Sequence, residues 1–506
     1  MQLLSSMVDQ HNKKNQEKLM QWLKELPDKS PKKKNHYFKK SGPGGHKART
    51  GDDIPLMPIG KAADMGWDKD GIPLINPRLF DSLEFSRNPH PYFKIMREHY
   101  PVYHDQLHNT YYLTRYDDCR RCANDDLGFN TIPKGRASTV LGNAQLELSG
   151  IEHRRRRGLY DRHLVGQALN KRQHSIESIA KEMIEDWERP GAKGVIEDGR
   201  VRAVELGAAF CNEFPVRVVS SVLGLPKGAQ AQFLYWYQSM MGGFGGSDTA
   251  KQGLQARQDL EDYVESIVEE RREKPTFLYD GEGNITGEDI ISLLCRTRID
   301  NDFLSTEEIT STIALLVGGG GDTTRGAIMN MWYLLLLHPE QLDAIKEDNN
   351  LWISAFQETL RYAVPAGASQ PKHTAFEAEI AGQSIPAGSL ILIMNHAANR
   401  DERFFNSAEK FDILRKDLHM GKMLRNGVDK DGKRSHLGFG VGSHFCPGAH
   451  ISQQEAVVCS KILLEHFKTP KLDLERCKKD IDQKSPAPLG ELAVSELWVN
   501  YPSKQA

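Results

Sequence analysis

One cysteine, Cys446, lies in a stretch whose composition favours a reactive or metal-ligating sulfur. The surrounding residues 436–450 read HLGFGVGSHFCPGAH, with glycines before the cysteine and Pro447 and Gly448 after it. Glycine lets the backbone turn so that amide N–H groups point at a sulfur, and a helix that begins just after the cysteine adds positive potential. Both effects favour a thiolate over a thiol. We therefore expect this sulfur to bind a metal or to act as a nucleophile.

Two other pairs of residues have side chains suited to chemistry, and within each pair the spacing places both residues on the same helix. Asp322 and Thr323 follow directly after four glycines, Gly318 to Gly321. An interior glycine costs a helix about 1 kcal/mol relative to alanine, so something other than helix stability must favour this run. Glu358 and Arg361 are three residues apart, a spacing that brings a carboxylate and a guanidinium together on one helix face.

The cysteine stretch carries a family pattern. Phe439, Gly442, Cys446 and Gly448 match F-x-x-G-x-x-x-C-x-G, which resembles the haem-binding loop of the cytochrome P-450 family. The resemblance implies that Cys446 is the axial thiolate ligand of the iron of haem b. It also implies that Phe439 and Gly440 lie against the haem, in a bacterial-type haem-thiolate monooxygenase.

The glycine run resembles a second motif of the same family. Residues 319–323 read GGGDT and match the oxygen-binding bend A/G-G-x-D/E-T of the long helix that crosses the haem. By this resemblance, Gly319 and Gly320 leave room for dioxygen, and Thr323 and Asp322 are catalytic residues that handle protons during O–O cleavage. Taken alone, the residues leave open that Thr323 bonds back to its own helix and that Asp322 pairs with an arginine.

Glu358 and Arg361 match the E-x-x-R motif of the family, and Arg415 follows the segment FDIL that resembles its third member. The resemblance implies a structural role for these three residues. They would form an ion-pair network that holds the cysteine loop in place.

Haem propionates require cations, and two stretches supply them. In GIEHRRRRG, His153 and Arg157 match the H-x-x-x-R pattern that binds propionates, and His444 matches a further propionate position. Without the resemblance, HRRRR would also fit a solvated basic helix face. Lys372 replaces an arginine that is usual in bacterial members, and because lysine lacks the bidentate fork, a propionate contact is not predicted for it.

The substrate pocket has the weakest pattern. Residues 233–246, FLYWYQSMMGGFGG, are dense in aromatic and Met side chains at the place where the family has its lid, and Met suits an adaptable apolar surface. Core packing explains the same stripe equally well. By resemblance, residues 130–149 and 364–369 also face the substrate, and the predicted pocket residues are Ala366, Gly319, Phe233 and Met240.

The elements that must position these residues are mostly helical. Ser305 and Glu308 form a capping-box pair that predicts a helix from there to about Leu337, before Pro339. A second helix ends near Pro365, and a third begins after Cys446 with Pro447 in its first turn. Residues 109–122 predict a short strand region, and residues 378–400 predict two short strands around a glycine-containing turn. The fold class is mostly α with small β-sheets, and the family resemblance implies one large triangular haem domain over residues 58–506.

Composition sets the remaining limits. Residues 1–50 hold 12 Lys and Arg against 4 Asp and Glu, and the remaining residues hold 54 against 64, so residues 1–57 predict a basic, flexible arm. A nucleic-acid or targeting role for this arm is the alternative, although no fold for base recognition follows. Seven cysteines in no framework spacing predict reduced thiols, and the absence of a signal or long apolar run predicts a cytoplasmic protein without a membrane span.

The resemblance also implies partners: dioxygen, a small and largely hydrophobic substrate, and a separate ferredoxin or flavodoxin with its NAD(P)H-dependent reductase. We expect this partner to dock near Cys446, where Arg154, Arg155 and Arg156 would steer its acidic surface. We expect a monomer that does not bind nucleic acid. A peroxide-driven hydroxylase, or an isomerase or dehydratase, would share the cysteine loop, but Asp322 together with Thr323 favours dioxygen activation. Two non-haem readings are a dinucleotide loop, which lacks the third glycine, and a zinc or redox pair at Cys119 and Cys122.

Overall fold

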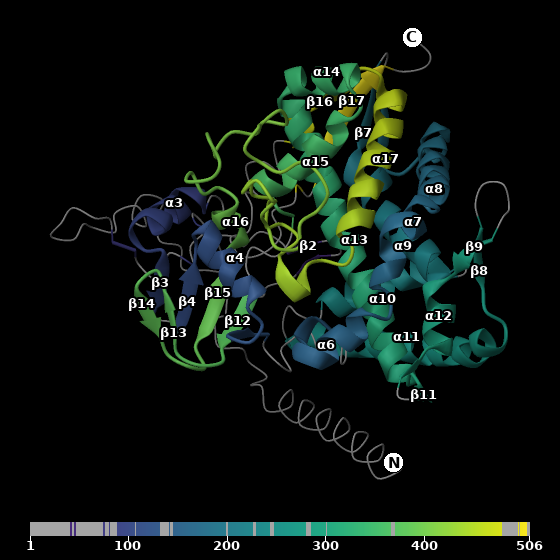
Figure 1. Cartoon of the computed structure of the whole chain (residues 1–506). Helices are drawn as coiled ribbons and strands as arrows, with labels where there is room; N and C mark the ends of the chain where they lie inside the picture. The colour runs from purple at the N-terminus through teal and green to yellow at the C-terminus, as the bar shows by residue number, and fades with distance from the viewer. Residues whose placement is uncertain are drawn as a thin grey trace.

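The computed structural model describes residues 41–42, 45–46, 74–75, 80, 85, 89–106, 108–131, 141, 145–198, 201–225, 229–242, 247–279, 285–299, 301–365, 370–477, 494 and 496–502. Over these residues the chain is mainly helical, as predicted, with strands gathered in small sheets (Figure 1). The boundary predicted between residues 57 and 58 lies outside the described residues, as do Ala366 and most of the segment 130–149.

The helices are α3 (His90–His99), α4 (Tyr116–Asn124), α6 (Gly150–Arg157), α7 (Gly166–Asn170), α8 (Gln173–Glu185), α9 (Phe214–Leu223), α10 (Gln230–Gly242), α11 (Ser247–Glu273), α12 (Ile290–Arg296), α13 (Thr306–Leu337), α14 (Pro339–Glu347), α15 (Leu351–Tyr362), α16 (Asn395–Ala398) and α17 (Ala449–Phe467). Short helical turns are η3 (Gln145–Glu147), η4 (Asp161–Leu164), η5 (Asp186–Glu188), η6 (Gly207–Cys211) and η9 (Gly442–His444).

Two larger sheets flank the helices. A five-stranded sheet has the order β3 (Val102–Asp105), β4 (Thr110–Leu113), β15 (Leu390–Ile393), β12 (Gln370–Thr374), β5 (Phe129–Asn130), and only the β4–β15 pair is parallel. A four-stranded antiparallel sheet has the order β16 (Lys471–Leu472), β17 (Trp498–Pro502), β7 (Val201–Glu205), β6 (Val195–Asp198). Two-stranded pairs are β1 (Ser41–Gly42) with β2 (Gly45–His46), β8 (Phe277–Tyr279) with β9 (Ile285–Glu288), β10 (Arg298–Ile299) with β11 (Asp302–Phe303), and β13 (Ala378–Ile380) with β14 (Gln383–Ile385).

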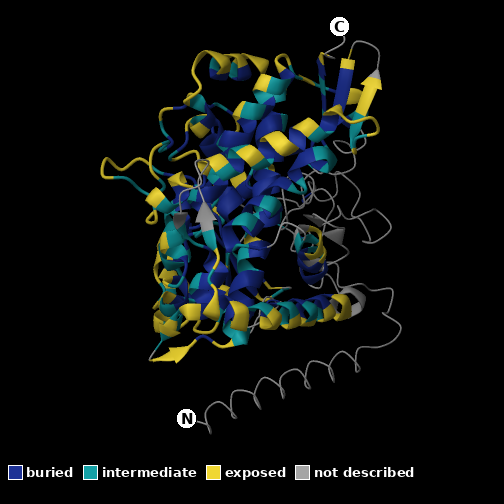
Figure 2. Cartoon of the chain, turned by 90° about the vertical axis from the view of Figure 1, so that its right-hand side faces the viewer, coloured by how far each residue is buried: buried dark blue, intermediate teal, exposed yellow. Residues whose placement is uncertain are grey.

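Helix α13 is the axis of the helical part. Its start has the predicted capping box: Ser305 Oγ accepts from the Glu308 N–H at 3.2 Å, and Glu308 Oε2 accepts from the Ser305 N–H at 3.0 Å. It ends before Pro339, and its 32 residues extend about 48 Å. Helices α9, α10, α11, α15 and α17 pack against it, so that most of α13 is buried at the centre of the molecule (Figures 1 and 2).

The strand prediction for residues 109–122 is half wrong. Strand β4 ends at Leu113, and the YDDCRRC stretch forms α4 instead. Its buried residues Tyr116, Cys119, Cys122 and Ala123 recur every three to four residues, which is the period of a helix. Acidic residues in the first turn also favour a helix start. The prediction for 378–400 missed one strand and the short helix α16.

The position of Cys119 and Cys122 on α4 bears on the prediction that they form a zinc or redox pair. Both thiols are buried, Cys119 Sγ donates to the Leu113 carbonyl at 3.2 Å, and burial raises the pKa of Cys122 to about 12. Among the described residues there is no group of three or more His, Cys, Asp or Glu that could hold a metal ion. Both cysteines therefore pack in the hydrophobic cluster beside the five-stranded sheet. No described helix is long and apolar enough to cross a membrane.

Buried histidines should make the fold sensitive to acid. Burial lowers the pKa of His396 and of His436 to about 3, whereas an unfolded chain titrates near its ordinary value of about 6.5. Below that value the unfolded chain binds protons that the folded chain does not, so stability is lost as pH falls from about 6.5 toward 3. Each histidine contributes up to about 1.4 kcal/mol per pH unit in this range.

Urea unfolding at pH 7 and at pH 5.5 measures this loss. We expect a lower free energy of unfolding at pH 5.5, and a smaller loss in His436→Gln, whose side chain cannot take up the proton. An identical pH dependence in the variant and the parent chain would show that His436 is not one of the acid-sensitive groups.

Candidate active site

The cysteine loop adopts a shape that two glycines make possible. Gly440 and Gly442 have φ of 66° and 76°, in the left-handed region that favours glycine. A β-carbon on Gly440 would lie 2.5 Å from Gln370 Nε2, and one on Gly442 would lie 2.6 Å from the Ala123 carbonyl oxygen. At Gly442 any side chain would collide with the backbone of α4, whereas at Gly440 the flexible Gln370 side chain would have to move. The loop is thereby pressed between β12 and the end of α4.

The sulfur of Cys446 lies inside this loop. The Cys446 N–H donates to the Phe439 carbonyl at 2.9 Å, which closes the loop around the side chain. Burial raises the pKa of the Cys446 thiol, while the N–H groups of Gly448 and Ala449 and the charge of Arg157 act in the opposite direction. The predicted amides are therefore present, but they do not outweigh burial.

The predicted place of Pro447 is wrong by two positions. Helix α17 begins at Ala449 with Gly448 as its N-terminal flanking residue, so Pro447 precedes the helix. Proline has no N–H to offer the sulfur, and the first available donors are accordingly those of Gly448 and Ala449.

Four basic side chains gather beside the loop. The rings of His153, from α6, and His444, from η9, stack with their centroids 4.0 Å apart. Burial lowers the pKa of His444 to about 3, and the nearby charges of His153, Lys372 and Arg157 act in the same direction. Two histidines from distant parts of the chain, for both of which the resemblance implies a propionate contact, are thus brought together.

Several nitrogens of this cluster have no hydrogen-bond partner within the described part of the chain. They are His153 Nε2, Arg157 Nε and Lys372 Nζ, and all three residues are buried. The Lys372 ammonium lies 3.7 Å from Asp126 Oδ1, too far for a good hydrogen bond. Buried donors of this kind are costly unless an acceptor meets them. The donor set fits an anionic ligand such as a carboxylate.

Arg157 is also linked to the surface. Its Nη2 lies 3.2 Å from Asp161 Oδ1, and the other oxygen of Asp161 accepts from Arg425 Nη2 at 2.7 Å. Arg425 is more than half exposed, whereas Arg157 is buried. The carbonyl of Arg425 accepts the Gly442 N–H at 2.7 Å. Asp161 therefore joins an inner and an outer cation at the edge of the cysteine loop.

The glycine run of α13 lies in continuous helix and has one open side. We call residues 319–323 the bend, after the family motif that they match. Gly319 is exposed although it lies in the middle of a buried helix, and a β-carbon on it would meet nothing within 4 Å. Thr323 Oγ1 donates to the Gly319 carbonyl at 2.6 Å, which is the back-bonded state expected of the residue alone. A β-carbon on Gly320 would lie 2.5 Å from Val219 Cγ2 of α9, so Gly320 faces away from the open side.

One hydrogen bond fixes this bend relative to the cysteine helix. Thr324, the residue after Thr323, donates through Oγ1 to Ser452 Oγ of α17 at 3.1 Å, and both side chains are buried. Ser452 is six residues after Cys446. The two motifs, 123 residues apart in sequence from Thr323 to Cys446, are thus joined side by side through α13 and α17.

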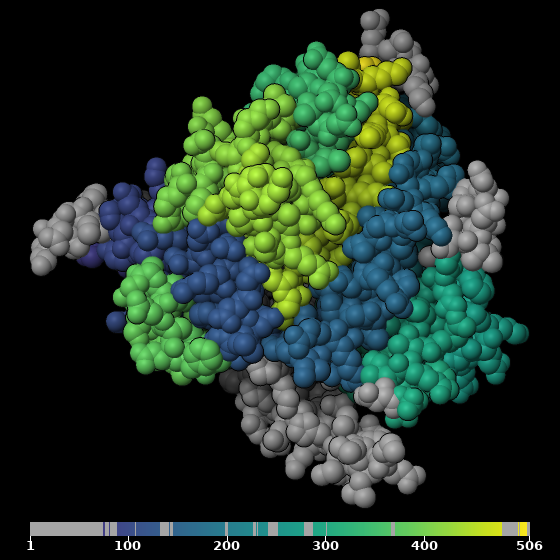
Figure 3. Space-filling model, in the orientation of Figure 1, coloured from purple at the N-terminus to yellow at the C-terminus, as the bar shows by residue number. Residues whose placement is uncertain are grey.

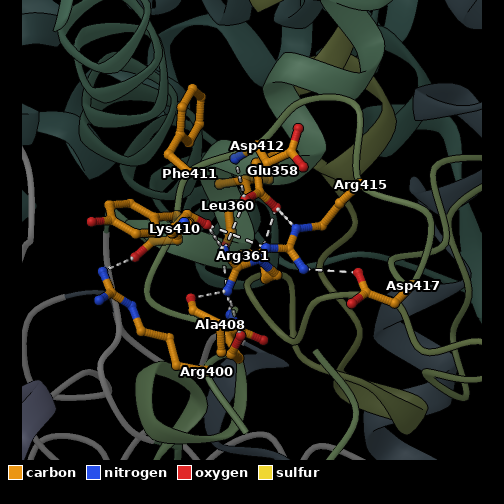
Figure 4. A network of polar contacts seen from close by, with 12 residues as sticks. Glu358, Leu360, Arg361, Arg400, Ala408, Lys410, Phe411, Asp412, Arg415 and Asp417 are labelled. Carbon is orange, nitrogen blue, oxygen red and sulfur yellow. Dashed lines mark hydrogen bonds and ion pairs between the residues drawn. The ribbon is translucent and has the colours of Figure 1, made fainter. Parts of the chain in front are cut away.

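Glu358, Arg361 and Arg415 form a buried network (Figure 4). Arg361 donates through Nε and Nη2 to the two carboxylate oxygens of Glu358 at 2.7 and 2.8 Å, and Arg415 Nε lies 3.0 Å from Glu358 Oε2. Arg361 also donates to the carbonyls of Asn399, Ala408 and Lys410, at 2.8 to 3.0 Å. The network therefore binds the irregular backbone that leads toward the cysteine loop.

Two of the predicted pocket residues lie in the core between helices. The Phe233 ring of α10 packs against Trp236 and against Tyr263 of α11, with centroids 5.1 and 5.4 Å apart. Met240 is buried in the same hydrophobic cluster. For Phe233 the sequence left open both core packing and a place in the pocket, and the structure shows core packing.

The predicted docking cations divide into inner and outer ones. Arg156 is buried, with Nε 3.0 Å from Glu152 and Nη2 3.1 Å from Glu308, so the expectation that it steers a partner is wrong. Arg155 is paired with Glu152 at 3.2 Å, and Arg154 is exposed.

The comparisons with known proteins agree with this geometry. The sequence model of the Cytochrome P450 family, written here cytochrome P-450, matches residues 244–492. Pulcherriminic acid synthase of Bacillus subtilis (strain 168) is 27% identical over 408 residues, which cover 79% of this chain and 94% of that protein. The 6-deoxyerythronolide B hydroxylase of Saccharopolyspora erythraea is 28% identical over 350 residues, covering 69% of this chain and 76% of the relative. The chain belongs to the cytochrome P-450 family.

The fold of this cytochrome P-450 matches solved structures of the family. The bacillaene polyketide synthase cytochrome PksS of Bacillus subtilis 168 superposes with a TM-score of 0.69, 24% identity, and coverage of 85% of this chain and 100% of that one. The chain is accordingly a monooxygenase with haem as its cofactor. The buried cations around His153 fit the carboxylates of such a group. At Gly319, α13 has no β-carbon and its exposed side is clear of other atoms within 4 Å.

Sequence reasoning missed two charges that complete the site. Asp161 lies four residues after Arg157, a spacing that could have indicated the ion pair on helical grounds. Asp126 beside Lys372 could not have been found, because the contact joins the turn between α4 and β5 to strand β12, which is far away in the sequence.

Glu358→Gln should destabilise the protein strongly, because it leaves the buried Arg361 guanidinium without a counter-charge. It also removes one of the two carboxylates beside Arg415, which keeps Asp417 at 2.8 Å. Breaking a buried pair costs about 3–5 kcal/mol, whereas an exposed pair contributes about 0–1 kcal/mol. Asp186→Asn is the matched control, since Asp186 pairs with Arg189 at the same i,i+3 spacing on the surface. Soluble yield and the urea midpoint report the difference, and equal losses in both variants would contradict a structural role for the network.

Proposed function

We propose that Cys446 is the axial ligand of haem iron and that His153, Arg157 and His444 hold the haem propionates. The observation that carries this proposal is the cluster of unpartnered buried nitrogens on His153 and Arg157 beside the cysteine loop. Lys372 joins them, because its ammonium is buried in the same cluster and has only a distant carboxylate beside it. Two guanidinium or ammonium cations and two imidazole rings match two carboxylates in charge and in hydrogen-bond donors.

Each residue of the bend has a distinct task under this proposal. A thiolate-ligated haem supplies an electron-rich iron that activates dioxygen for transfer of one oxygen atom to a substrate. Gly319 leaves space on the open side of α13 for the reacting molecules. Thr323 holds a proton on Oγ1, now donated to the Gly319 carbonyl, and can turn it toward the open side. Asp322, half-buried next to Thr323, exchanges protons with solvent.

For substrates we propose small, largely hydrophobic metabolites that are hydroxylated or epoxidised. The names of similar proteins support this proposal. They include a polyketide biosynthesis cytochrome, a 6-deoxyerythronolide B hydroxylase and the cyclomarin C epoxidase CymV of Salinispora arenicola. The buried apolar residues of α10 support an apolar surrounding for the substrate. Buried Val364, at the described start of the predicted pocket segment 364–369, supports it as well. Pocket roles for Ala366, Gly319 and Met240 remain part of this proposal.

Electrons would come from a separate ferredoxin or flavodoxin with its reductase. Arg154 and Arg425 are exposed cations near the cysteine loop, and acidic surfaces are steered by such charges. On the face shown in Figure 3, the yellow-green segment that precedes α17 lies at the surface between α4 and α6. This face would bring a donor near Cys446.

The experiment that tests the haem assignment is the visible spectrum of the reduced carbon monoxide complex. The parent chain should give the red-shifted Soret band of thiolate ligation, and Cys446→Ser should lose it. Cys295→Ser is the matched control, because Cys295 is also buried but lies in α12 away from the loop. The proposal fails if Cys446→Ser keeps the band or if the control loses it.

Arg154→Glu should slow reduction by an acidic ferredoxin about 3- to 10-fold at low salt and less at high salt, because the steering charge is reversed and salt screens it. Stopped-flow reduction of the haem-loaded protein measures this rate. Lys274→Glu reverses an exposed charge just after α11 and should leave the rate unchanged. Equal slowing in both variants would indicate a general charge effect and not a docking site.

A further inference from the structure

The family bend accounts for only part of the glycine run on α13. Gly319 and Gly320 occupy its small positions, but Gly321 occupies the position that the pattern A/G-G-x-D/E-T leaves open. An additional glycine weakens the helix by about 1 kcal/mol immediately before Asp322 and Thr323. A contact specific to this chain should therefore explain why Gly321 has no side chain.

The structure supplies that contact. A β-carbon on Gly321 would lie 3.2 Å from Cε1 of Tyr237 on α10 and 3.3 Å from Cγ2 of Val216 on α9. Both neighbouring side chains are buried. Glycine at this position lets the Tyr237 ring lie directly against the backbone of α13, one residue before Asp322. The Tyr237 ring thus lies close to the place where a side chain of residue 321 would begin.

Tyr237 belongs to a helix that is itself held by aromatic packing. On α10, Trp236 and Phe233 face Tyr263 of α11, with Trp236 and Tyr263 centroids 5.5 Å apart. Tyr237 is the next residue and points instead at α13. Figure 1 shows α10 lying beside the part of α13 that faces α9 and α11. A shift of α10 would therefore act on the bend through Tyr237.

We propose that Tyr237 is a positioning residue for Asp322 and Thr323. Its ring, packed on Gly321, holds a backbone that four glycines would otherwise leave easily deformed, and it links the position of α10 to the geometry of the proton-handling pair. The proposal rests on the proposed function of that pair. It also means that a substrate which displaces α10 changes the bend directly.

Hydrogen exchange at residues 319–324 of the haem-loaded protein tests the contact. Tyr237→Leu should speed exchange at the bend about tenfold or more, because the ring no longer covers it. Tyr237→Phe keeps the ring and should behave like the parent chain. Trp236→Leu, the matched control, removes a ring of α10 that faces α11, and should speed exchange in α10 and α11 but not at the bend.

A double variant tests whether the two groups act on each other. Gly321→Ala alone should also speed exchange at the bend, because its methyl must displace the ring. In the Tyr237→Leu background the same alanine should not speed exchange further. It should slow exchange instead, because the ring is already gone and alanine strengthens the helix. Additive effects of the two changes would contradict a direct contact.

The products of oxygen reduction provide the functional readout. With NADPH and a ferredoxin and reductase pair, and no added substrate, oxygen that takes two electrons and two protons leaves as hydrogen peroxide, whereas oxygen that takes four of each leaves as water. The ratio of peroxide released to NADPH consumed should rise in Thr323→Ala, which loses the proton donor. It should rise toward the same value in Tyr237→Leu, and stay at the parent value in Tyr237→Phe and Trp236→Leu.

The outcomes separate this inference from the proposed function. If Thr323→Ala leaves the ratio unchanged, the function proposed for the pair fails and the positioning role falls with it. If Thr323→Ala raises the ratio but Tyr237→Leu does not, or if Trp236→Leu raises it equally, only the positioning role is overturned.

Discussion

The carboxylate of Glu358 is the charge on which the irregular part of this protein depends. It is fully buried between the guanidinium groups of Arg361 and Arg415. An unpaired carboxylate in that place would be prohibitively costly, and each arginine alone would be costly as well. Because Arg361 then donates to three backbone carbonyls, the ion pair organises a stretch of chain that has neither helix nor sheet to satisfy it. The segment that leads to Cys446 acquires its shape from side-chain donors.

Close approach of backbones is the second constraint, and it explains the glycines at both motifs. Gly442 lets the cysteine loop touch the last turn of α4, and Gly321 lets α10 touch α13. In both places the chain accepts weaker local structure in return for contact between elements that are far apart in sequence. The candidate catalytic residues Cys446 and Thr323 lie next to these contacts. Precise placement of Cys446 and Thr323 thus comes from tertiary packing.

The sequence predicted the motifs and the long helices because their signals are local. The capping box at Ser305, the spacing of Glu358 and Arg361, and the pattern around Cys446 all lie within short stretches. Residues 109–122 were misread because tyrosines favour strands, while the helical period of the buried residues was overlooked. Arg156 was placed at the surface because a run of arginines does not reveal which member turns inward to Glu308. The Asp126 and Tyr237 contacts depend on packing between distant segments, which no local pattern encodes.

The two-sided pairing of Asp161 has a consequence for how the surroundings act on the site. Its inner partner, Arg157, is buried, while its outer partner, Arg425, is more than half exposed to solvent. Dissolved salt screens exposed charges over about 8 Å at physiological ionic strength but has far less effect on buried ones. Whatever loosens Arg425, whether ions or an acidic macromolecule, leaves more of the Asp161 charge to Arg157. The electrostatic potential at the cysteine loop is therefore open to adjustment from outside the molecule, through a single shared carboxylate.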